Sequence, residues 1–379
     1  MIFFFLRSVS KARMTRILIL VALASVIGVL LLVAALLWRA LRFTIPYPIR
    51  QELSAEEIVY PIDAVFTWVD SSDEQWAQTK SNLLLEAGVE DEPQRWSNDT
   101  TPEAELELSI ELLLQNAPWI RHIFIVTMRP QRPRCLDTNS AIRERRSKIS
   151  VVHHDEIWEE ASHLPSFNSH AIEAHLHRIP GLSEHFLYLN DDVFVTQPML
   201  PNNWFYDGKP IFYPNGGKHS RLFYGIYLNS HGMAWRNLHG MLNHKPVHLK
   251  HFVHPLTKTV LSDIERGGPW SMALKHTKKS RFRSEDDIPP IGLALNVGLQ
   301  NNTVVLVDPK LIHTQYIGSD VAHHLKTDPL PQIVCVNNSK NNIDDEVHNL
   351  RSVLQKDHQR SWTIVDDRRR SSTIVDDRQ

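Results

Sequence analysis

Cysteine is scarce in this chain, since Cys135 and Cys335 are the only two among 379 residues. Two cysteines could pair in an oxidising compartment, but they cannot build the disulfide framework of a small secreted scaffold. A basic excess is absent too. The formal net charge of −2 argues against a general nucleic-acid binder, and we expect no nucleic-acid partner. What is present is a hydrophobic content of 42%, which is that of a folded protein with a sizeable core.

One segment lacks charge altogether. Residues 17–38 are apolar and long enough to cross a bilayer core of about 30 Å. Positive residues stand before this segment at Arg7, Lys11, Arg13 and Arg16. This bias favours a cytoplasmic N-terminus, although a cleaved signal peptide is the alternative. The sequence therefore predicts a single-pass type II membrane protein whose later residues are luminal or extracytoplasmic, in a Golgi lumen if the host is eukaryotic.

The remaining chain divides by its composition. Residues 1–16 form the cytoplasmic end, 39–60 a stem, 61–345 a folded domain and 346–379 a tail in which TIVDDR occurs twice. Apolar runs predict strands at 61–70, 122–127, 148–154 and within 186–195. Helical patterns lie between them, at 102–116 and 166–179. This alternation predicts an α/β fold with a Rossmann-like sheet and much parallel pairing.

Polar side chains follow several of these predicted strands. Asp70, Thr127 and the Asn190-Asp191-Asp192 cluster all lie at carboxyl ends. In open α/β sheets this edge is where ligands bind. The acidic cluster could hold a hard divalent cation, Mg²⁺ or Mn²⁺, at Asp191 and Asp192, as a bound diphosphate requires. An ordinary β-turn is the plainer interpretation, because Asn and Asp are favoured in turns.

Three further groups have both a chemical and a structural interpretation. Glu173 and His177 lie one helical turn apart and would form an acid–base pair, metal ligands or a solvated salt bridge. The segment HLKHFVHPLTKTVL, residues 248–261, offers a histidine as general base or is a polar loop. Arg281 and Arg283 would grip phosphate oxygens or belong to a charged surface turn.

Taken together, these segments resemble the Stealth family. PIDAVFTWVD is similar to the family's first motif, and the stretch from AELELSIELLLQNAPWIRHIFIVT through HAIEAHLHRIPGLSEHFLYLNDD to its second. HFVHPLTKTVL with RFRSEDD resembles the third motif, and IVCVNNS the fourth. The family includes bacterial capsular-polysaccharide sugar-phosphate transferases and the α/β subunit of the lysosomal-enzyme N-acetylglucosamine-1-phosphotransferase. The similarity runs in the family's order from residue 60 to about residue 340.

The resemblance implies a glycosyltransferase-A-like mixed sheet flanked by helices, and it implies roles for single residues. The implied donor-binding residues are Asp63, Trp68, Asp70, Asn190, Asp191 and Arg281. The implied catalytic residues are His251 as general base, Asp192, Glu173 and Arg283. His254 stands close enough to His251 to leave the base open, and the spacing does not decide between Arg281 and Arg283.

The chain departs from the family's pattern at two motifs. Where the family has two arginines in its second motif, this chain has Glu107 and Glu111, which reverses the charge of that helix. An expected Asn-Asp in the fourth motif is Asn337-Asn338. These changes would mean a different donor or acceptor, or lost activity.

The sequence thus predicts an enzyme that moves a hexose- or HexNAc-1-phosphate from a UDP-sugar to the hydroxyl of a glycan or glycoprotein, with release of UMP. One alternative is a metal-dependent glycosyltransferase that releases UDP. Another is an inactive, membrane-anchored glycan-binding homologue. A homo-oligomer is left open.

Overall fold

The computed structural model of this protein describes residues 11–41, 49–53, 57–89, 103–215, 230–317, 320–326, 329–336 and 344–356. The repeated TIVDDR segments of the tail, together with Arg7 and Asn337-Asn338, lie outside the described residues. The chain divides into two compact units, one of residues 1–48 with 243–245 and the other of the remaining chain.

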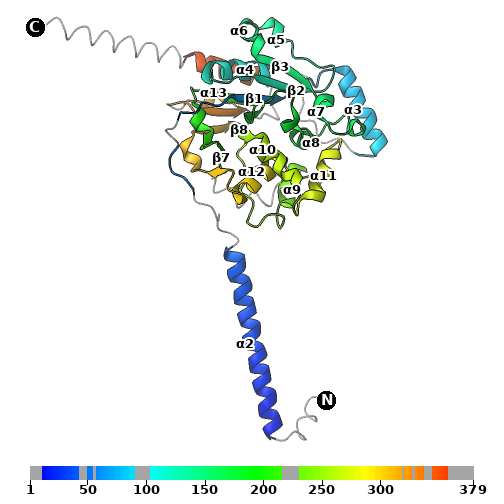
Figure 1. Cartoon of the computed structure of the whole chain (residues 1–379), viewed down its shortest axis with the longest axis vertical. Coiled ribbons are helices and arrows are strands. Elements are labelled where there is room, and N and C mark those ends of the chain that lie inside the picture. The colour runs from blue at the N-terminus through cyan, green and yellow to red at the C-terminus, as the bar shows by residue number, and fades with distance from the viewer. Residues whose placement is uncertain are drawn as a thin grey trace, which may run out of the picture. The chain divides into compact units, whose positions relative to one another are not determined.

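The first unit contains helix α2 (Lys11–Leu41), which includes the whole of the predicted segment 17–38 (Figure 1). Its described side chains from 18 to 33 are exposed, whereas those of position 17 and of 34–38 are not described. Within the described residues, we find no helix that is both long enough and apolar enough to span a membrane.

The second unit is built on a five-stranded sheet in the order β3-β2-β1-β4-β8. Its strands are β1 (Ile62–Thr67), β2 (Ile123–Thr127), β3 (Ile149–His153), β4 (His185–Asn190) and β8 (His254–Thr257). Pairs β1–β2, β2–β3 and β1–β4 are parallel, and β8 joins β4 antiparallel. The prediction of a Rossmann-like, mixed α/β sheet is confirmed.

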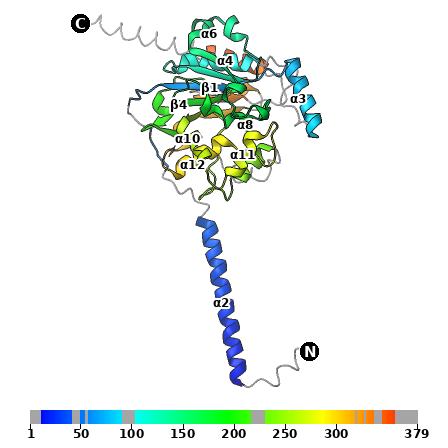
Figure 2. The same cartoon turned by 45° about the vertical axis from the view of Figure 1, so that its right-hand side comes forward.

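Helices cover both faces of this sheet, which is why its central strands are apolar throughout rather than alternating. Figures 1 and 2 show α4 (Glu103–Asn116) on one side of β1, and α10 (Lys258–Asp263) and α12 (Pro290–Gln300) on the other. Further helices belong to this unit. They are α3 (Glu74–Ala87), α5 (Cys135–Thr138), α6 (Ser140–Glu144), α7 (His154–Ile157), α8 (Ser169–Glu173), α9 (Ser230–Asn237), α11 (Ser271–Lys279) and α13 (Val321–His324).

The segment 186–195 does not form one continuous strand. β4 ends at Asn190, residues 191–192 turn, and β5 (Val193–Val195) enters a second sheet in the order β10-β11-β5. Strands β10 (Thr314–Ile317) and β11 (Ile333–Val336) are parallel, and β5 pairs with β11 antiparallel. A third sheet is formed by β6 (Phe205–Tyr206), β7 (Lys209–Phe212) and β9 (Val305–Leu306). The acidic turn therefore links the first two sheets.

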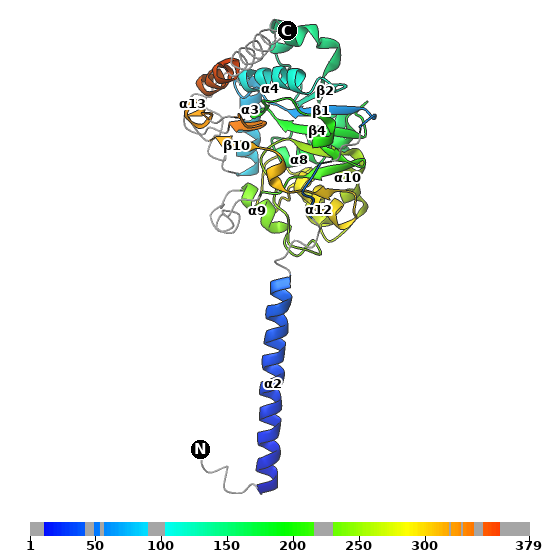
Figure 3. The ribbon, with the colours of Figure 1, turned by 90° about the vertical axis from the view of Figure 1, so that its left-hand side faces the viewer.

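Helix α4 is buried on two faces, as its apolar sequence predicts. Leu106 and Ile110 pack into the core of the large sheet. Leu108 and Leu112 pack into a second cluster, formed with β5, β11 and the helix at 344–356. Figure 3 shows that last helix, in red, beside α4.

The folded unit extends past the predicted bounds of 61–345. At its start, Arg50 bridges to Val307, and Leu53 and Ile58 pack against the core. At its end, Val347 and Leu350 are buried in the second cluster. Parts of the predicted stem and of the predicted tail thus belong to the domain.

Candidate active site

A topological switch point lies between β1 and β4. From β1 the chain continues to β2 and β3 on one side, and it then returns to β4 on the other side. Such a reversal opens a crevice at the carboxyl ends of the two strands, where open α/β sheets bind ligands. Thr67 and Asn190, the last residues of β1 and β4, are paired at this edge. This crevice is the candidate active site.

A buried tyrosine organises the polar side chains of the crevice. The Tyr188 hydroxyl lies 3.1 Å from Thr67 Oγ1, 2.8 Å from Asn190 Oδ1 and 3.4 Å from Glu173 Oε1. Tyr188 is only 2% exposed, and burial raises both its pKa and the pKa of Glu173. The hydroxyl therefore joins β1, β4 and the end of α8 in one network.

His251 extends this network toward the acidic turn. Its Nε2 lies 3.0 Å from Asn190 Nδ2, and its Nδ1 lies 3.1 Å from Cys335 Sγ and 3.9 Å from Asp192 Oδ2. Because Asn190 Oδ1 accepts from Tyr188, the amide nitrogen faces His251, and Nε2 accepts. The proton of the neutral ring is then on Nδ1, which donates to Cys335 Sγ, and Nε2 carries the lone pair that a general base needs.

The structure separates His251 from His254, which the sequence left as alternatives. The side chain of His251 is 37% exposed and borders the crevice. His254 opens β8 and is partly buried, and this burial lowers its pKa to about 3. A ring with so low a pKa is less suited to take a proton from a bound substrate, so the structure favours His251 as the predicted base.

The turn between β4 and β5 gathers negative charge. The pKa of Asp191 is raised to about 7, mainly because the side chain is buried and also because the charge of Asp192 is close by. Glu105 of α4 adds a third carboxyl group, whose pKa is raised well above its usual range by burial, Asp191 and Asp192, with Asp344 contributing. Oxygen donors that repel one another in this way fit a hard divalent cation, which would remove the repulsion.

The two arginines of the RFRSEDD segment have different environments. Arg281 Nη2 donates to the backbone carbonyls of Ser162 and Leu164, at 2.9 and 3.0 Å. Arg283 donates to Ser169 Oγ at 2.6 Å, and its charge opposes the rise that burial causes in the pKa of Glu173. Arg281 therefore braces the loop that precedes α8, and its role in donor binding stays a prediction, whereas Arg283 lies near Glu173.

Three predicted donor-binding residues of the first motif have structural roles instead. Asp63 stands four positions before Thr67, about 13 Å along β1. It is buried there, and it accepts from Arg121 Nε at 2.8 Å and from the Ser183 backbone at 2.7 Å. Trp68 belongs to the hydrophobic core. Asp70 Oδ1 accepts from the backbone and the hydroxyl of Ser72, which closes a turn.

Glu173 and His177 do not form the predicted pair. Helix α8 ends at Glu173, so the regular spacing that would align the two residues is lost. His177 Nε2 lies 3.6 Å from Glu265, in an ion cluster with Arg178 and Lys278. Glu173 instead faces Tyr188 and Arg283.

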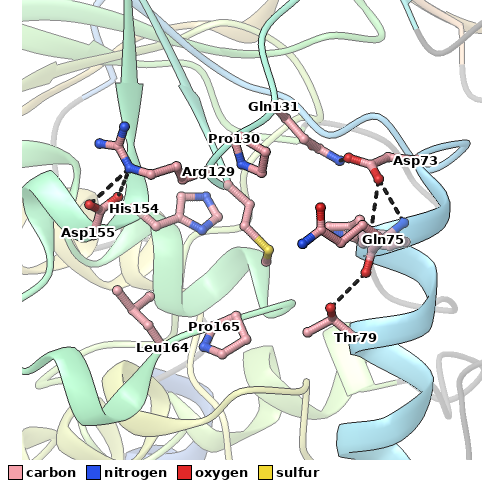
Figure 4. A pocket seen from close by; sticks show the side chains of 12 residues that line it. Asp73, Gln75, Thr79, Arg129, Pro130, Gln131, His154, Asp155, Leu164 and Pro165 are labelled. Atoms are coloured by element: carbon pink, nitrogen blue, oxygen red, sulfur yellow. Dashed lines mark hydrogen bonds and ion pairs between the residues drawn. The ribbon is translucent and has the colours of Figure 1, made fainter.

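A cavity of about 360 Å³ lies at the same sheet edge, next to the ends of β2 and β3. Figure 4 shows Gln75 and Thr79 of α3 on one side, and Arg129, His154 and Asp155 on the other. The other lining residues are Asp73, Trp76, Met128, Pro130, Gln131, Leu164 and Pro165. An aromatic and apolar lining with a few polar groups is typical of a small-molecule site.

Sequence reasoning missed three residues of the site: Glu105, Tyr188 and Cys335. Glu105 is one of several glutamates on α4, so the sequence does not single it out. In the sequence, Tyr188 is not distinguishable from the other residues of its apolar strand. Cys335 lies at the site only because β11 pairs with β5. The two cysteines do not pair: both are free and buried.

The two glutamates that depart from the family's pattern point away from the crevice. Asn139 Nδ2 donates to Glu107 at 2.6 Å and also to Glu111. Arg351 forms an ion pair with Glu111 at 2.8 Å. The charge reversal is therefore accommodated by α4's neighbours, and it adds no negative charge to the acidic turn.

Comparison with family models gives two matches. Residues 60–85 match Stealth protein CR1, conserved region 1, and residues 100–211 match Stealth protein CR2, conserved region 2. These residues are therefore similar to two conserved regions of the Stealth family. The two regions contain β1, α4, α8, β4 and the acidic turn. The resemblance of 251–287 and 333–339 to the family's third and fourth motifs stays a prediction.

Several curated proteins with similar sequences are bacterial phosphotransferases. An exopolysaccharide phosphotransferase of Streptomyces coelicolor is 36% identical over 242 residues, which cover 62% of this chain and 39% of the relative. A capsular polysaccharide phosphotransferase of Neisseria meningitidis serogroup B is 44% identical over 152 residues, 38% of each chain. The chain spans about two fifths of the length of these relatives.

Solved structures with a similar course of the chain are distant. A galactosyltransferase, LgtC, solved with donor and acceptor sugar analogues, has a TM-score of 0.41 at 12% identity, covering 78% of this chain and 95% of its own. Mouse xyloside xylosyltransferase 1 has a TM-score of 0.37 at 11% identity, covering 74% and 98%.

Proposed function

We propose that the protein is a sugar-1-phosphate transferase, which moves hexose- or HexNAc-1-phosphate from a UDP-sugar to a hydroxyl of a polysaccharide or other glycan. The observation that carries this proposal is the convergence of His251, Arg283 and Glu173 with the acidic turn at the switch point. The names of the similar bacterial proteins, which are polysaccharide phosphotransferases, support the same reaction class.

The cavity beside β2 and β3 suits the nucleoside of the donor. Trp76 and two prolines offer flat apolar surfaces, and Gln131 and Arg129 offer polar contacts. The crevice at β1 and β4 lies along the same edge of the sheet, so a donor that begins in the cavity would direct its diphosphate toward Asn190 and Asp191. This division of the edge supports a glycosyltransferase-A-like arrangement of the donor.

His251 would begin the reaction when its Nε2 accepts the proton of the acceptor hydroxyl. That nitrogen now accepts from Asn190 Nδ2, so the acceptor hydroxyl would replace the amide contact. The acceptor oxygen bonds to the phosphorus that carries the sugar, and the bond from this phosphorus to the bridging oxygen breaks. UMP leaves with that oxygen, and the sugar–oxygen bond survives. Asp192, near Nδ1, would stabilise the imidazolium.

Positive charge is needed where the phosphoryl oxygens gather. Arg283 would donate to them, and Glu173 would hold its guanidinium in place. Asp191 and Asp192, with Glu105 beside them, fit a Mg²⁺ or Mn²⁺ ion, which supplies charge against the diphosphate when bound. The other residues act by positioning, because phosphoryl transfer requires little covalent chemistry from the protein.

The nucleotide product decides between the candidate functions. The full chain would be incubated with a panel of UDP-sugars, Mg²⁺ or Mn²⁺ and glycoside acceptors, and the products identified by mass. UMP and a phosphodiester-linked product are expected. UDP would instead establish an ordinary glycosyltransferase, and glycan binding without either nucleotide would establish a binding homologue.

Asp192→Asn tests the site itself. We expect turnover to fall about 10²–10⁴-fold, because the variant removes charge from both the proposed cation site and the imidazolium. Thermal melting should show a folded protein, since the backbone contact from Val336 N to Asp192 O remains. Unchanged turnover in the folded variant would contradict the proposed site.

We also propose that the segment 17–38 anchors the chain in a membrane, with the folded unit luminal or extracytoplasmic. The support is its uncharged sequence and the positive residues before it. Resistance of the chain to alkaline extraction from membranes would test this, and complete release would contradict it.

A further inference from the structure

We propose that Asp192, His251 and Cys335 form a binding site for a Zn²⁺ ion. One oxygen, one nitrogen and one sulfur from these three side chains lie within 4.8 Å of one another. The three residues come from separate segments: the turn after β4, the loop before β8, and β11. Their convergence follows from the fold rather than from a local sequence motif.

The distances fit one face of a tetrahedral zinc site. His251 Nδ1 lies 3.1 Å from Cys335 Sγ, Cys335 Sγ 3.6 Å from Asp192 Oδ2, and Nδ1 3.9 Å from that same oxygen. Zinc bond lengths and a tetrahedral angle place neighbouring ligand atoms about 3.3–3.6 Å apart. Shifts of about half an ångström would bring all three atoms to this spacing.

The kinds of donor atom favour zinc over the harder cations. A thiolate and an imidazole are ligands of Zn²⁺, whereas Mg²⁺ prefers oxygen throughout. Glu105 and Asp191 offer only oxygen, so the harder cation of the proposed reaction belongs with them. Asp192 is shared by both sites, and the two ions would therefore compete. Binding of zinc would release the thiol proton of Cys335 to solvent.

The surroundings hold the three ligands in place. Cys335 is paired with Val193 in the antiparallel ladder of β11 and β5, one residue from Asp192. Val336 N donates to Asp192 O at 3.0 Å, which pins the backbone of the turn. Two ligands are thus fixed by the second sheet, and only His251, which is 37% exposed, comes from outside it.

Asn190 can support the metal-bound form of His251. A zinc-bound Nδ1 has no proton, so Nε2 must carry it and donate to a partner. Rotation of the Asn190 amide would present Oδ1 to Nε2–H and Nδ2 to the Tyr188 hydroxyl, which can accept. Asn190 can therefore keep its contacts with His251 and Tyr188 whether the ring proton of His251 is on Nδ1 or on Nε2. The fourth zinc position would face the crevice and hold water or a substrate oxygen.

Direct metal binding tests this site without reference to activity. The full chain would be titrated with Co²⁺ as a spectroscopic substitute for zinc, and with Zn²⁺ against a chromophoric chelator. Wild type should show a thiolate-to-cobalt charge-transfer band, and it should bind one equivalent of zinc in competition with the chelator. Cys335→Ser should lose both, whereas Cys135→Ser is the matched control and should keep both, because Cys135 is a free, buried thiol in α5.

A second variant covers a failure of Cys335→Ser to fold. His251→Gln, at a partly exposed ring, should lose the same zinc equivalent and weaken or remove the band. A band of unchanged intensity in Cys335→Ser, or one lost only in Cys135→Ser, would overturn the proposal. Equal zinc stoichiometry in wild type and folded His251→Gln would overturn it too.

A consequence for catalysis rests on the proposed function. Zinc on His251 would prevent it from taking the acceptor proton, so Zn²⁺ should inhibit sugar-phosphate transfer and a chelator should restore it. A cobalt band that is present in wild type and lost in Cys335→Ser, with no transferase activity in wild type, would refute the proposed reaction and leave the metal site. Transfer that is insensitive to zinc, with no band, would refute the metal site alone.

Discussion

At the scale of single residues, similar side chains in one motif have different roles. Arg281 and Arg283 stand two positions apart, yet one donates to backbone carbonyls and the other lies beside Glu173 and Ser169. A guanidinium has several donors in a fixed plane, which lets Arg281 hold two carbonyls at once. The chemistry available to each arginine is decided by what already occupies its donors.

Lysine substitutions separate these two roles. Arg283→Lys should lower turnover about 10²–10³-fold with little change in melting temperature, because a planar donor at the phosphoryl oxygens is lost. Arg281→Lys should keep turnover per folded molecule and melt at a lower temperature, because an ammonium does not reproduce both carbonyl contacts. Kinetics and calorimetry on the two variants would check this. The opposite pattern would assign the phosphate role to Arg281.

At the scale of elements, α4 serves three neighbours at once. Its apolar residues fill two clusters, Glu105 faces the acidic turn, and Glu107 and Glu111 face Asn139 and Arg351. Positions 105 and 107 differ by about 200° around a helix, so these carboxyl groups have unrelated environments. We therefore expect Glu107 and Glu111 to affect stability rather than catalysis.

A charge-restoring double variant tests this conclusion. Glu107→Arg with Glu111→Arg should lower the melting temperature by a few degrees, because Arg351 then faces a like charge worth about 1 kcal/mol. Turnover per folded molecule should be unchanged. Glu105→Gln is the comparison: it should relieve repulsion, raise the melting temperature and weaken the response to Mg²⁺. A gain of activity in the double variant would mean that the glutamates had disabled the enzyme.

At the scale of the whole molecule, buried histidines make the fold sensitive to acid. Burial lowers the pKa of His154 and His254 to about 3 and that of His175 to about 4. The unfolded chain has ordinary histidines near 6.5 and takes up protons that the folded chain refuses. Their contribution to stability is therefore complete above about pH 6.5 and is lost as pH falls toward 4, at about 1.4 kcal/mol per pH unit for each ring.

His154→Phe should reduce this sensitivity. Among the described residues, His154 Nδ1 has no hydrogen-bond partner, so the ring is replaceable without breaking a bond there. The fall in melting temperature from pH 7.5 to 5.5 should be smaller in the variant than in wild type. His313→Phe, at an exposed position, is the control and should retain the wild-type fall. Equal falls in all three proteins would contradict the linkage.

Local patterns predicted much of the fold, and contacts between distant segments account for the errors. The apolar strands, α4 and the polar ends of β1 and β4 follow from residues close in sequence. Asp63 was misassigned because its partner Arg121 lies 58 positions later. The site's Cys335 depends on a strand pairing across 142 positions, 335 against 193. Helix α8 ends early because tertiary packing competes with its apolar spacing.

The turn between β4 and β5 joins two sheets with only residues 191 and 192 between the strands. Because β4 is paired with β1 and β8 and β5 is paired with β11, the two-residue connection has no spare length. One inserted or deleted residue would displace a whole ladder by half a pleat, exchanging its inward and outward side chains. A change of chain length at this point should therefore disrupt one of the two sheets, whereas a substitution can alter the site and leave both ladders in register.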